Sequence, residues 1–266
     1  MNISVQLVQL ILSFISGILV GFSLGLIGGG GSILAIPLLI YFVGYDHPHL
    51  AIGTTALAVG INAFLNLIPH TRAGHVNYKI GAMFSLTGIA GVIFGAELGL
   101  LTPGGKLLFI FAAMMLFISA IMFRRSIHLN PVQAPFDKER KVPSKSVIKI
   151  MLSGLGVGFL SGYFGIGGGF LIVPALMFSS GLEIINAIGT SLISVGTFGT
   201  VTTLTYALSG KIDLLISAFF ILGGIGGGWL GAREASSLPT KTLTQMFSII
   251  IAIVAFYMLY MNFHSI

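Results

Sequence analysis

Two glycine clusters are the parts of this chain whose composition and spacing best suit chemistry with an anion. Each cluster interrupts an apolar helical stretch and lets a new one begin. Because a helix N-terminus presents unpaired N–H groups and the positive end of its dipole, a restart in an apolar setting favours an anion. The members are Gly28, Gly29, Gly30, Gly31 and Ser32 in the first cluster and Gly165, Gly167, Gly168 and Gly169 in the second.

Pro37 and Pro174 follow the two clusters, and each is expected to kink or limit the short helix that contains it. Further along, hydroxyl and amide side chains lie on two long apolar stretches, where they can bind a ligand oxyanion. Helix capping and hydrogen bonds between helices explain the same residues without a ligand. This set is Thr54, Thr55, Asn62, Thr190, Ser191 and Ser194.

Charged residues inside the apolar stretches are scarce, and Glu97 and Arg233 are the deepest. Intramembrane charges often carry a coupling ion such as a proton. Both residues lie near helix ends. Two alternatives to a coupling role are therefore that their side chains extend to the membrane interface or that they form a structural ion pair.

One pattern raises the alternative of a membrane enzyme. Residues 21–25 spell GFSLG, which matches the GxSxG pattern around a serine nucleophile, here Ser23. A serine nucleophile needs a base, and all six histidines are expected in loops or at helix ends. With no cysteine in the chain, thiolate metal sites and cysteine nucleophiles are excluded as well. We therefore expect no catalytic residue, no metal and no cofactor.

The elements that position these residues must lie in lipid. Hydrophobic residues make up 55% of the 266 residues and charged residues only 8%, against about 25% in soluble domains. So few polar side chains cannot coat a surface in water, which excludes an ordinary soluble enzyme. The net charge of +6 comes largely from residues 124–149, which hold seven of the thirteen basic side chains. Such a loop is typical of a cytoplasmic segment under the positive-inside rule, and we expect no nucleic-acid partner.

Apolar runs long enough to cross a bilayer predict eight membrane helices. Two shorter runs, 32–43 and 170–178, are too short to cross alone and are expected to be half-helices. The predicted fold is thus an all-α polytopic membrane protein. The eight long runs are 3–26, 51–69, 80–101, 105–123, 147–164, 187–208, 212–232 and 243–263.

An internal repeat organises the whole chain. Residues 21–39 match residues 158–176 at nine of nineteen positions with an offset of 137, and AIGT at 51–54 returns at 187–190 with an offset of 136. Two homologous halves, 1–123 and 147–266, are therefore expected, joined by a basic cytoplasmic linker at 124–146. Five crossings in each half would make the halves inverted and four would make them parallel, and the distribution of basic residues slightly favours inversion.

These features together resemble one family. The spelling GxxxGxxGxGGG, a proline shortly after it and an AIGTS or AIGTT block, all present twice, are similar to the TauE/SafE family of sulfite-exporter-like permeases. The resemblance implies a multi-pass transporter of the inner membrane for sulfite, sulfonates or other small organic acids. It also implies that both glycine motifs and the hydroxyl residues after them form the substrate site. Ser32 departs from its repeat partner Gly169, so the halves are not expected to be equivalent around the ligand.

The function predicted from the sequence is a secondary transporter that moves a small anion by alternating access between two repeats. Its partners would be the anionic substrate, the lipid bilayer and, as one option for coupling, protons. An anion channel of the same architecture is the first alternative and a polytopic membrane enzyme the second.

Overall fold

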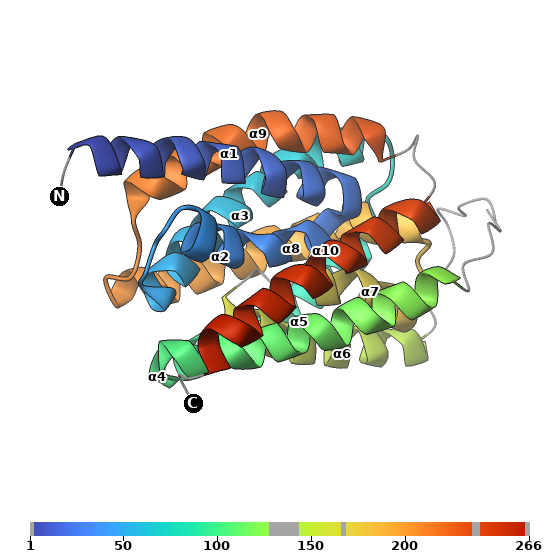
Figure 1. The fold of residues 1–266 in the computed structure, drawn as a ribbon. Coiled ribbons are helices and arrows are strands. Elements are labelled where there is room, and N and C mark those ends of the chain that lie inside the picture. Colours follow the sequence, from blue (N-terminus) through green and yellow to red (C-terminus); the bar gives the residue numbers. More distant parts are fainter. Residues whose placement is uncertain (1–2, 128–143, 166–168, 236–239, 264–266) are drawn as a thin grey trace. The chain divides into compact units, whose positions relative to one another are not determined.

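The computed structural model describes residues 3–127, 144–165, 169–235 and 240–263, and this part of the chain consists of helices and their connections (Figure 1). A 3₁₀ segment η1 and a wider π segment η2 flank the short helix α2. The elements are α1 (Ile3–Ile27), η1 (Gly28–Leu34), α2 (Ala35–Pro37), η2 (Leu38–Phe42), α3 (Pro48–Arg72), α4 (Tyr78–Leu101), α5 (Gly104–Ile127), α6 (Ser144–Phe164), α7 (Gly169–Ser180), α8 (Ile184–Leu208), α9 (Leu214–Glu234) and α10 (Thr240–Asn262).

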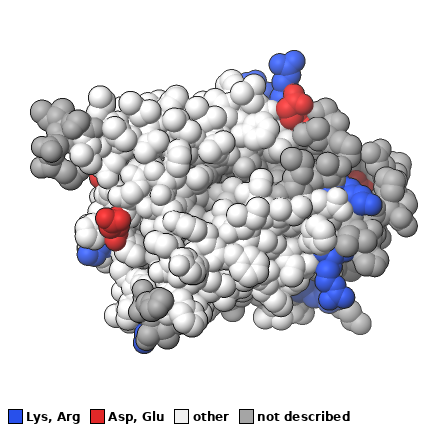
Figure 2. Space-filling view, in the orientation of Figure 1, with Lys and Arg blue, Asp and Glu red and all other residues white. Residues whose placement is uncertain are grey.

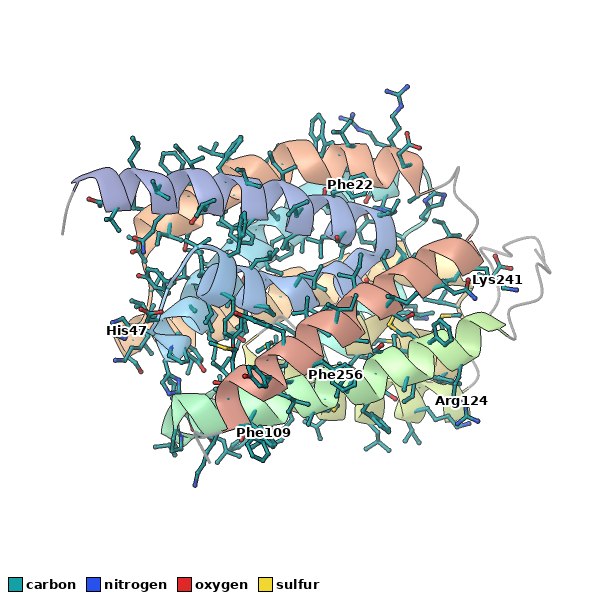
Figure 3. All side chains as sticks on the ribbon, viewed as in Figure 1. Phe22, His47, Phe109, Arg124, Lys241 and Phe256 are labelled. Atoms are coloured by element: carbon teal, nitrogen blue, oxygen red, sulfur yellow. The ribbon has the colours of Figure 1, made fainter. Side chains whose placement is uncertain are left out.

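Seven helices are long and apolar enough to cross a membrane: α1, α3, α4, α5, α6, α8 and α9. They match seven of the eight predicted spans. The eighth predicted span forms α10, of which Ser248–Asn262 is a shorter apolar stretch, and the two short runs form η1–α2–η2 and α7. The predicted all-α polytopic membrane fold is confirmed. On the face drawn in Figure 2, most atoms outside the grey regions belong to uncharged residues, as a lipid-facing surface requires.

The chain divides into two compact units that do not follow the boundaries of the predicted repeats. One unit consists of residues 1–101 and 142–236, and the other of residues 102–141 and 237–266. The second unit contains α5 and α10, where the Ser119 hydroxyl donates to the backbone oxygen of Ser248 at 2.6 Å. Each unit therefore combines helices from both halves of the sequence, and the candidate site lies in the larger one.

Within the larger unit, α1, α3 and α9 form what we call the first bundle, and α4, α6 and α8 the second bundle. In the first bundle α1 and α9 pack backbone to backbone through glycines (Figure 1). A Cβ atom on Gly21 would collide with the backbone of Gly224, and one on Gly25 would collide with Gly228. Only glycine permits this distance, as small residues do between membrane helices.

The second bundle repeats these contacts at the equivalent positions of the predicted repeat. A Cβ on Gly158 would collide with the backbone of Gly88, and one on Gly162 with that of Val92. Adding 137 to Gly21 gives Gly158, and subtracting 136 from Gly224 gives Gly88. The first bundle thus combines α1 and α3 of the first half with α9 of the second half. The second bundle combines α6 and α8 of the second half with α4 of the first half. The recurrence supports the repeat, which itself stays a prediction.

The contacts between α3 and α8 connect the two bundles and run antiparallel. Gly60 lies against Gly199. Gly53, which precedes Gly60 on α3, lies against Tyr206 near the end of α8 and against the backbone of Lys211 in the following loop. The unit consequently has two ends. We name them the His75 end, where α3 and α9 finish and α4 and α8 begin, and the Lys211 end.

Candidate functional site

The first interruption begins where α1 ends at Ile27. Gly28 has φ of +68°, a left-handed conformation that L-residues with a side chain rarely adopt. A Cβ on Gly28 would also lie 2.8 Å from both the Ile188 backbone oxygen and the Ser191 hydroxyl. Glycine is therefore required at this position for two reasons: the backbone is left-handed, and α8 approaches too closely for a side chain.

Two side chains from different helices bind the backbone groups at this interruption. In an unbroken α-helix the Gly29 N–H would donate to the Gly25 carbonyl, four residues earlier. Here the Gly29 N–H donates to the Ser191 Oγ of α8 at 3.1 Å. The Gly25 carbonyl lies 2.8 Å from the Nε2 of His70 of α3. The two partners of one regular helical hydrogen bond have thus each gained a side-chain partner.

The second interruption follows α6 and uses backbone alone among its described residues. Gly165 has φ of +67°, and its N–H donates to the Gly162 carbonyl at 3.1 Å. Gly162 is the repeat equivalent of Gly25. A Cβ on Gly165 would collide with the side chain of Ile52. The predicted residues Gly167 and Gly168 lie outside the described residues.

The two interrupted segments meet where they restart. A Cβ on Gly29 would collide with the backbone of Gly169, and a Cβ on Gly169 would collide with Gly29. Gly169 is the first residue of α7, and the first N–H groups of a helix have no acceptor within that helix. Neither η1 nor α7 has an acidic residue in its first turn. Two positive helix ends thus converge without a carboxylate to compensate them.

Ser32 and Ser191 complete this meeting point, and both are fully buried. The Ser32 hydroxyl donates to the Gly29 carbonyl at 2.8 Å, and the Ser191 hydroxyl donates to the Ile188 carbonyl at 2.7 Å. A hydroxyl rotates easily to donate to another acceptor, so both serines are suited to an oxyanion. The predicted residues that the structure brings together are Gly28, Gly29, Ser32, Gly169 and Ser191.

Thr54 and Thr190 have a different role from the one expected. The Thr54 hydroxyl accepts from the Asp213 N–H at 2.9 Å, and the Thr190 hydroxyl accepts from the Asn77 N–H, also at 2.9 Å. Asp213 and Asn77 then cap the next helices through N–H groups of Ile216 and Ile80, in equivalent fashion. Both threonines anchor connecting loops, so they are positioning residues at opposite ends of the unit.

Thr55 does not join Ser191, although the two positions are equivalent in the repeat. Its hydroxyl donates to Ala51 and Ile52 on its own helix. Thr55 is level with about residue 204 of α8, roughly 20 Å from Ser191 at the helical rise of about 1.5 Å per residue. Ser194 bonds instead with Ser85 of α4 at 2.8 Å. The structure therefore does not bring the hydroxyls of Thr54, Thr55, Thr190 and Ser191 together.

Glu97 and Arg233 are both exposed and lie near the C-terminal ends of α4 and α9. Because α4 runs parallel to α8 and α9 runs parallel to α3, the two helices are antiparallel, and these residues lie at opposite ends of the unit. They do not form an ion pair with each other. The prolines lie inside the short helices as expected, with Pro37 immediately before the π segment and Pro174 within α7.

His70 lies in the last turn of α3, at a helix end as expected, but it was not among the predicted site residues. Only 1% of His70 is exposed, and its ring centroid lies 5.8 Å from that of His75 in the following loop. Burial lowers the pKa of His75 below its ordinary value near 6.5. The signal that could have found His70 is its spacing, because Asn62, Asn66 and His70 share one face of α3 at four-residue intervals.

Asn62 and Asn66 form a polar column with His70 inside the first bundle. Both amides are 1% exposed, and neither has a hydrogen-bond partner among the described residues. They press against Gly224 and Gly228 of α9, where a Cβ would collide with them. An unpaired buried amide costs about 1–3 kcal/mol, so two of them on one face indicate a role beyond packing.

The fold and the interrupted helices define a polytopic membrane protein in which two broken segments meet inside a helical bundle. A family model described as Sulfite exporter TauE/SafE matches residues 13–258. This chain belongs to that family.

Curated relatives cover nearly the whole chain. A "Probable membrane transporter protein" of Xylella fastidiosa strain 9a5c is 44% identical over 259 residues, which are 97% of each chain. The "Probable membrane transporter protein YdhB" of Bacillus subtilis is 26% identical over 88% of this chain and 92% of its own. A "Probable membrane transporter protein" of Methanocaldococcus jannaschii, MJ0441, is 27% identical over 91% and 94%. No solved structure matches this chain.

Proposed function

We propose that this protein is a secondary transporter for a small anion, such as sulfite, a sulfonate or another small organic acid. The observation that carries the proposal is the meeting of two interrupted segments at Gly29 and Gly169. Family membership supports transport as the function, because the relatives are described as probable membrane transporters. Interrupted helices in matching places are typical of transporter binding sites.

The chemistry of the meeting point suits an anion without a charged side chain. No Asp, Glu, Lys or Arg is buried among the described residues. An anion would be held by N–H groups of the first turn of α7 and by the hydroxyls of Ser32 and Ser191, assisted by the helix dipoles. In a low-dielectric interior such dipoles act strongly on a charge. This arrangement also rejects cations.

Alternating access would move the first bundle against the second, not one contiguous half of the sequence against the other. The glycine contacts bind α1 to α9 and α4 to α6 rigidly, whereas η1 and α7 lie between the bundles. Because α3 and α8 are equivalent in the repeat and run antiparallel, two membrane-crossing copies would have opposite orientations. That geometry favours inverted repeats with five crossings each.

The orientation in the membrane follows from the positive-inside rule. In the larger unit, the His75 end contains Arg72, Lys79, Lys149 and Arg233, whereas the opposite end contains Lys211. We therefore place the His75 end, and with it the basic linker, in the cytoplasm of a cell whose inner membrane holds the protein.

The test is uptake of radiolabelled sulfite by proteoliposomes that contain the purified chain. Saturable uptake, accelerated by unlabelled sulfite or a sulfonate inside the vesicles, is expected of a carrier. Flux that rises without saturation and shows no exchange would indicate an anion channel instead. Chemical conversion of the label would indicate an enzyme.

Ser191→Ala removes a hydroxyl from the proposed site, and Thr203→Val on the same helix is its control, since the Thr203 hydroxyl bonds only its own helix at Gly199. We expect Ser191→Ala to raise the half-saturation concentration about tenfold, the equivalent of about 1.4 kcal/mol. Unchanged affinity in a folded Ser191→Ala protein would refute this site.

A further inference from the structure

His70 contacts the backbone at the first helix interruption, so the protonation state of its ring can affect that interruption. Its Nε2 lies 2.8 Å from the Gly25 carbonyl, and a carbonyl can only accept. Nε2 must therefore be the protonated nitrogen, which leaves a basic lone pair on Nδ1 of the neutral ring. That Nδ1 is buried and has no hydrogen-bond partner in the described part of the chain.

His70 is also unusual among the buried side chains. Besides Tyr206, it is the only titratable residue that is buried within the described ranges. Tyr206 occupies the equivalent position of the repeat, since 70 and 206 differ by 136. At this pair of equivalent positions only His70 is a buried base whose ordinary pKa falls in the physiological range. His49, whose ring centroid lies 6.5 Å from that of Tyr206, is only half-buried.

The groups that surround His70 limit it to one added proton. From the loop after α3, His75 places its ring centroid 5.8 Å away. Two imidazolium rings at this separation would repel each other, so the pair is expected to take one proton at a time. In the described segments, α1 contributes no titratable side chain beside Gly25. The other titratable residues whose side chains are described at this end are Arg72, Tyr78, Lys79, Lys149, Glu183, Arg233 and Glu234.

Asn62 and Asn66 extend the polar surface from His70 into the first bundle. The equivalent positions of the second bundle are Phe198 and Thr202, so the two buried amides belong to the first bundle only, whereas Thr202 contributes a buried hydroxyl without a partner among the described residues. Both amides are unpaired and 1% exposed. Amides in this position can hold water molecules that deliver a proton to a buried base.

We propose that His70 is the proton-binding residue of this transporter and that its protonation on Nδ1 is coupled to anion binding at the first helix interruption. The inference rests on the proposed function, and it names the coupling ion of that site. The proton comes from water on one side of the membrane and returns to water on the other, with Nε2 keeping its hydrogen bond to Gly25 throughout.

The coupling has a direct physical basis. Gly25, which His70 holds, and Gly29, which Ser191 holds, are the two partners of one would-be helical hydrogen bond. An imidazolium there places a positive charge beside a site that has no other buried charge. Proton and anion then favour each other's binding by the same factor, as linkage requires.

The first experiment measures the proton site directly. The full chain, labelled with ¹⁵N-histidine and held in detergent micelles, is titrated from pH 8 to pH 5 by NMR, with and without methanesulfonate. We expect one histidine, assigned by its loss in His70→Gln, to titrate at Nδ1 and to gain proton affinity when methanesulfonate is present. A His70 that stays neutral throughout, or one indifferent to the anion, overturns the proposal. If His70→Gln does not fold, the signal is assigned by substituting the other five histidines in turn.

The second experiment measures coupling in proteoliposomes with labelled methanesulfonate, which stays fully ionised over this range, so that any pH dependence comes from the protein. A gradient of one pH unit should drive about tenfold accumulation in the unmodified protein if one proton accompanies one anion. His70→Gln keeps a donor for Gly25 but has no base. It should still exchange methanesulfonate, at a lower apparent affinity because the imidazolium is missing, and it should show no accumulation driven by the gradient. Tyr206→Phe, the matched control, should accumulate methanesulfonate as the unmodified protein does.

The outcomes separate the two proposals. Gradient-driven accumulation that persists in His70→Gln overturns the role of His70 while leaving the transporter intact. Absence of any methanesulfonate or sulfite flux in the unmodified protein counts against the proposed function. In that case the NMR titration still decides whether His70 binds a proton next to an anion site.

Discussion

The first and second bundles share their glycine contacts but differ in the side chains that their central helices direct at those contacts. Gly21 meets Gly224 as Gly158 meets Gly88, yet α3 presents Asn62, Asn66 and His70 where α8 presents Phe198, Thr202 and Tyr206. A common backbone frame thus carries two amides and an imidazole in one bundle, and a phenyl ring and two hydroxyl side chains in the other. We infer that the frame serves folding in both bundles and that chemistry is concentrated in the first.

The shared frame is expected to fail equally in both bundles when its glycines acquire side chains. Gly21→Leu and Gly158→Leu each place carbon atoms against the backbone of a partner helix, which cannot move aside as a side chain can. Both variants should lose the folded peak in size-exclusion chromatography. Gly226→Leu and Gly156→Leu, where nothing lies within 4 Å, are the matched controls and should remain folded. Survival of either core variant would show that the glycine contacts are looser than described.

The polar column of Asn62, Asn66 and His70 is expected to lower the stability of the fold and to support transport. Asn62→Leu replaces an unpaired buried amide with an apolar group of similar size, so it should raise the free energy of unfolding by about 1–3 kcal/mol. Sulfite flux should fall in the same variant. The reverse change in the second bundle, Phe198→Asn, should lower thermal stability by at least as much. Equal effects in the two bundles would remove the asymmetry proposed for them.

Thr54→Val and Thr190→Val should have nearly equal effects, since each removes the acceptor of one loop N–H. A loss of about 1–2 kcal/mol is expected for each in thermal unfolding, because Asp213 or Asn77 keeps an unpaired N–H. Substrate affinity should not change in either variant. A change in affinity would return these threonines to the binding site.

The smallest effect concerns His75, whose folded pKa is lowered by burial. The unfolded chain then binds a proton more readily than the folded protein does. Its contribution to stability is therefore present above an ordinary pKa near 6.5 and is lost as pH falls toward the lower folded pKa. His75→Gln should flatten the decline in melting temperature between pH 7 and pH 5. An unchanged decline would assign it to other groups.

The spans and interruptions were predictable because their signals are local. Apolar length predicted the helices, and the clusters around Gly28 and Gly165 predicted both breaks, since a left-handed turn needs glycine at that residue. The partners of the breaks could not be predicted in this way. Ser191 and His70 reach Gly29 and Gly25 across 162 and 45 residues, and sequence spacing does not encode such distances.

The same limit applies to the hydroxyl residues, which the sequence grouped and the structure does not bring together. Thr54 and Thr55 adjoin each other in sequence, as do Thr190 and Ser191, and adjacency suggested one binding shell. Successive residues of a helix point in directions about 100° apart. Thr54 and Thr190 face connecting loops, whereas Thr55 bonds its own helix and Ser191 contacts Gly29. The repeat offset is a better guide to the site than adjacency in the sequence. It pairs His70 with Tyr206 and so identifies a position at which the two bundles carry different side chains.

The exchange of helices between the bundles also affects how the protein is made. The glycine face of α1 meets its partner on α9 about 200 residues later in the chain. At a synthesis rate of about 5–20 residues per second, α1 waits about 10–40 s in the membrane before α9 arrives. During that interval its packing surface faces lipid or an insertion factor. Neither half of the chain can complete its own packing, so release from biosynthesis depends on the last part of the sequence being made.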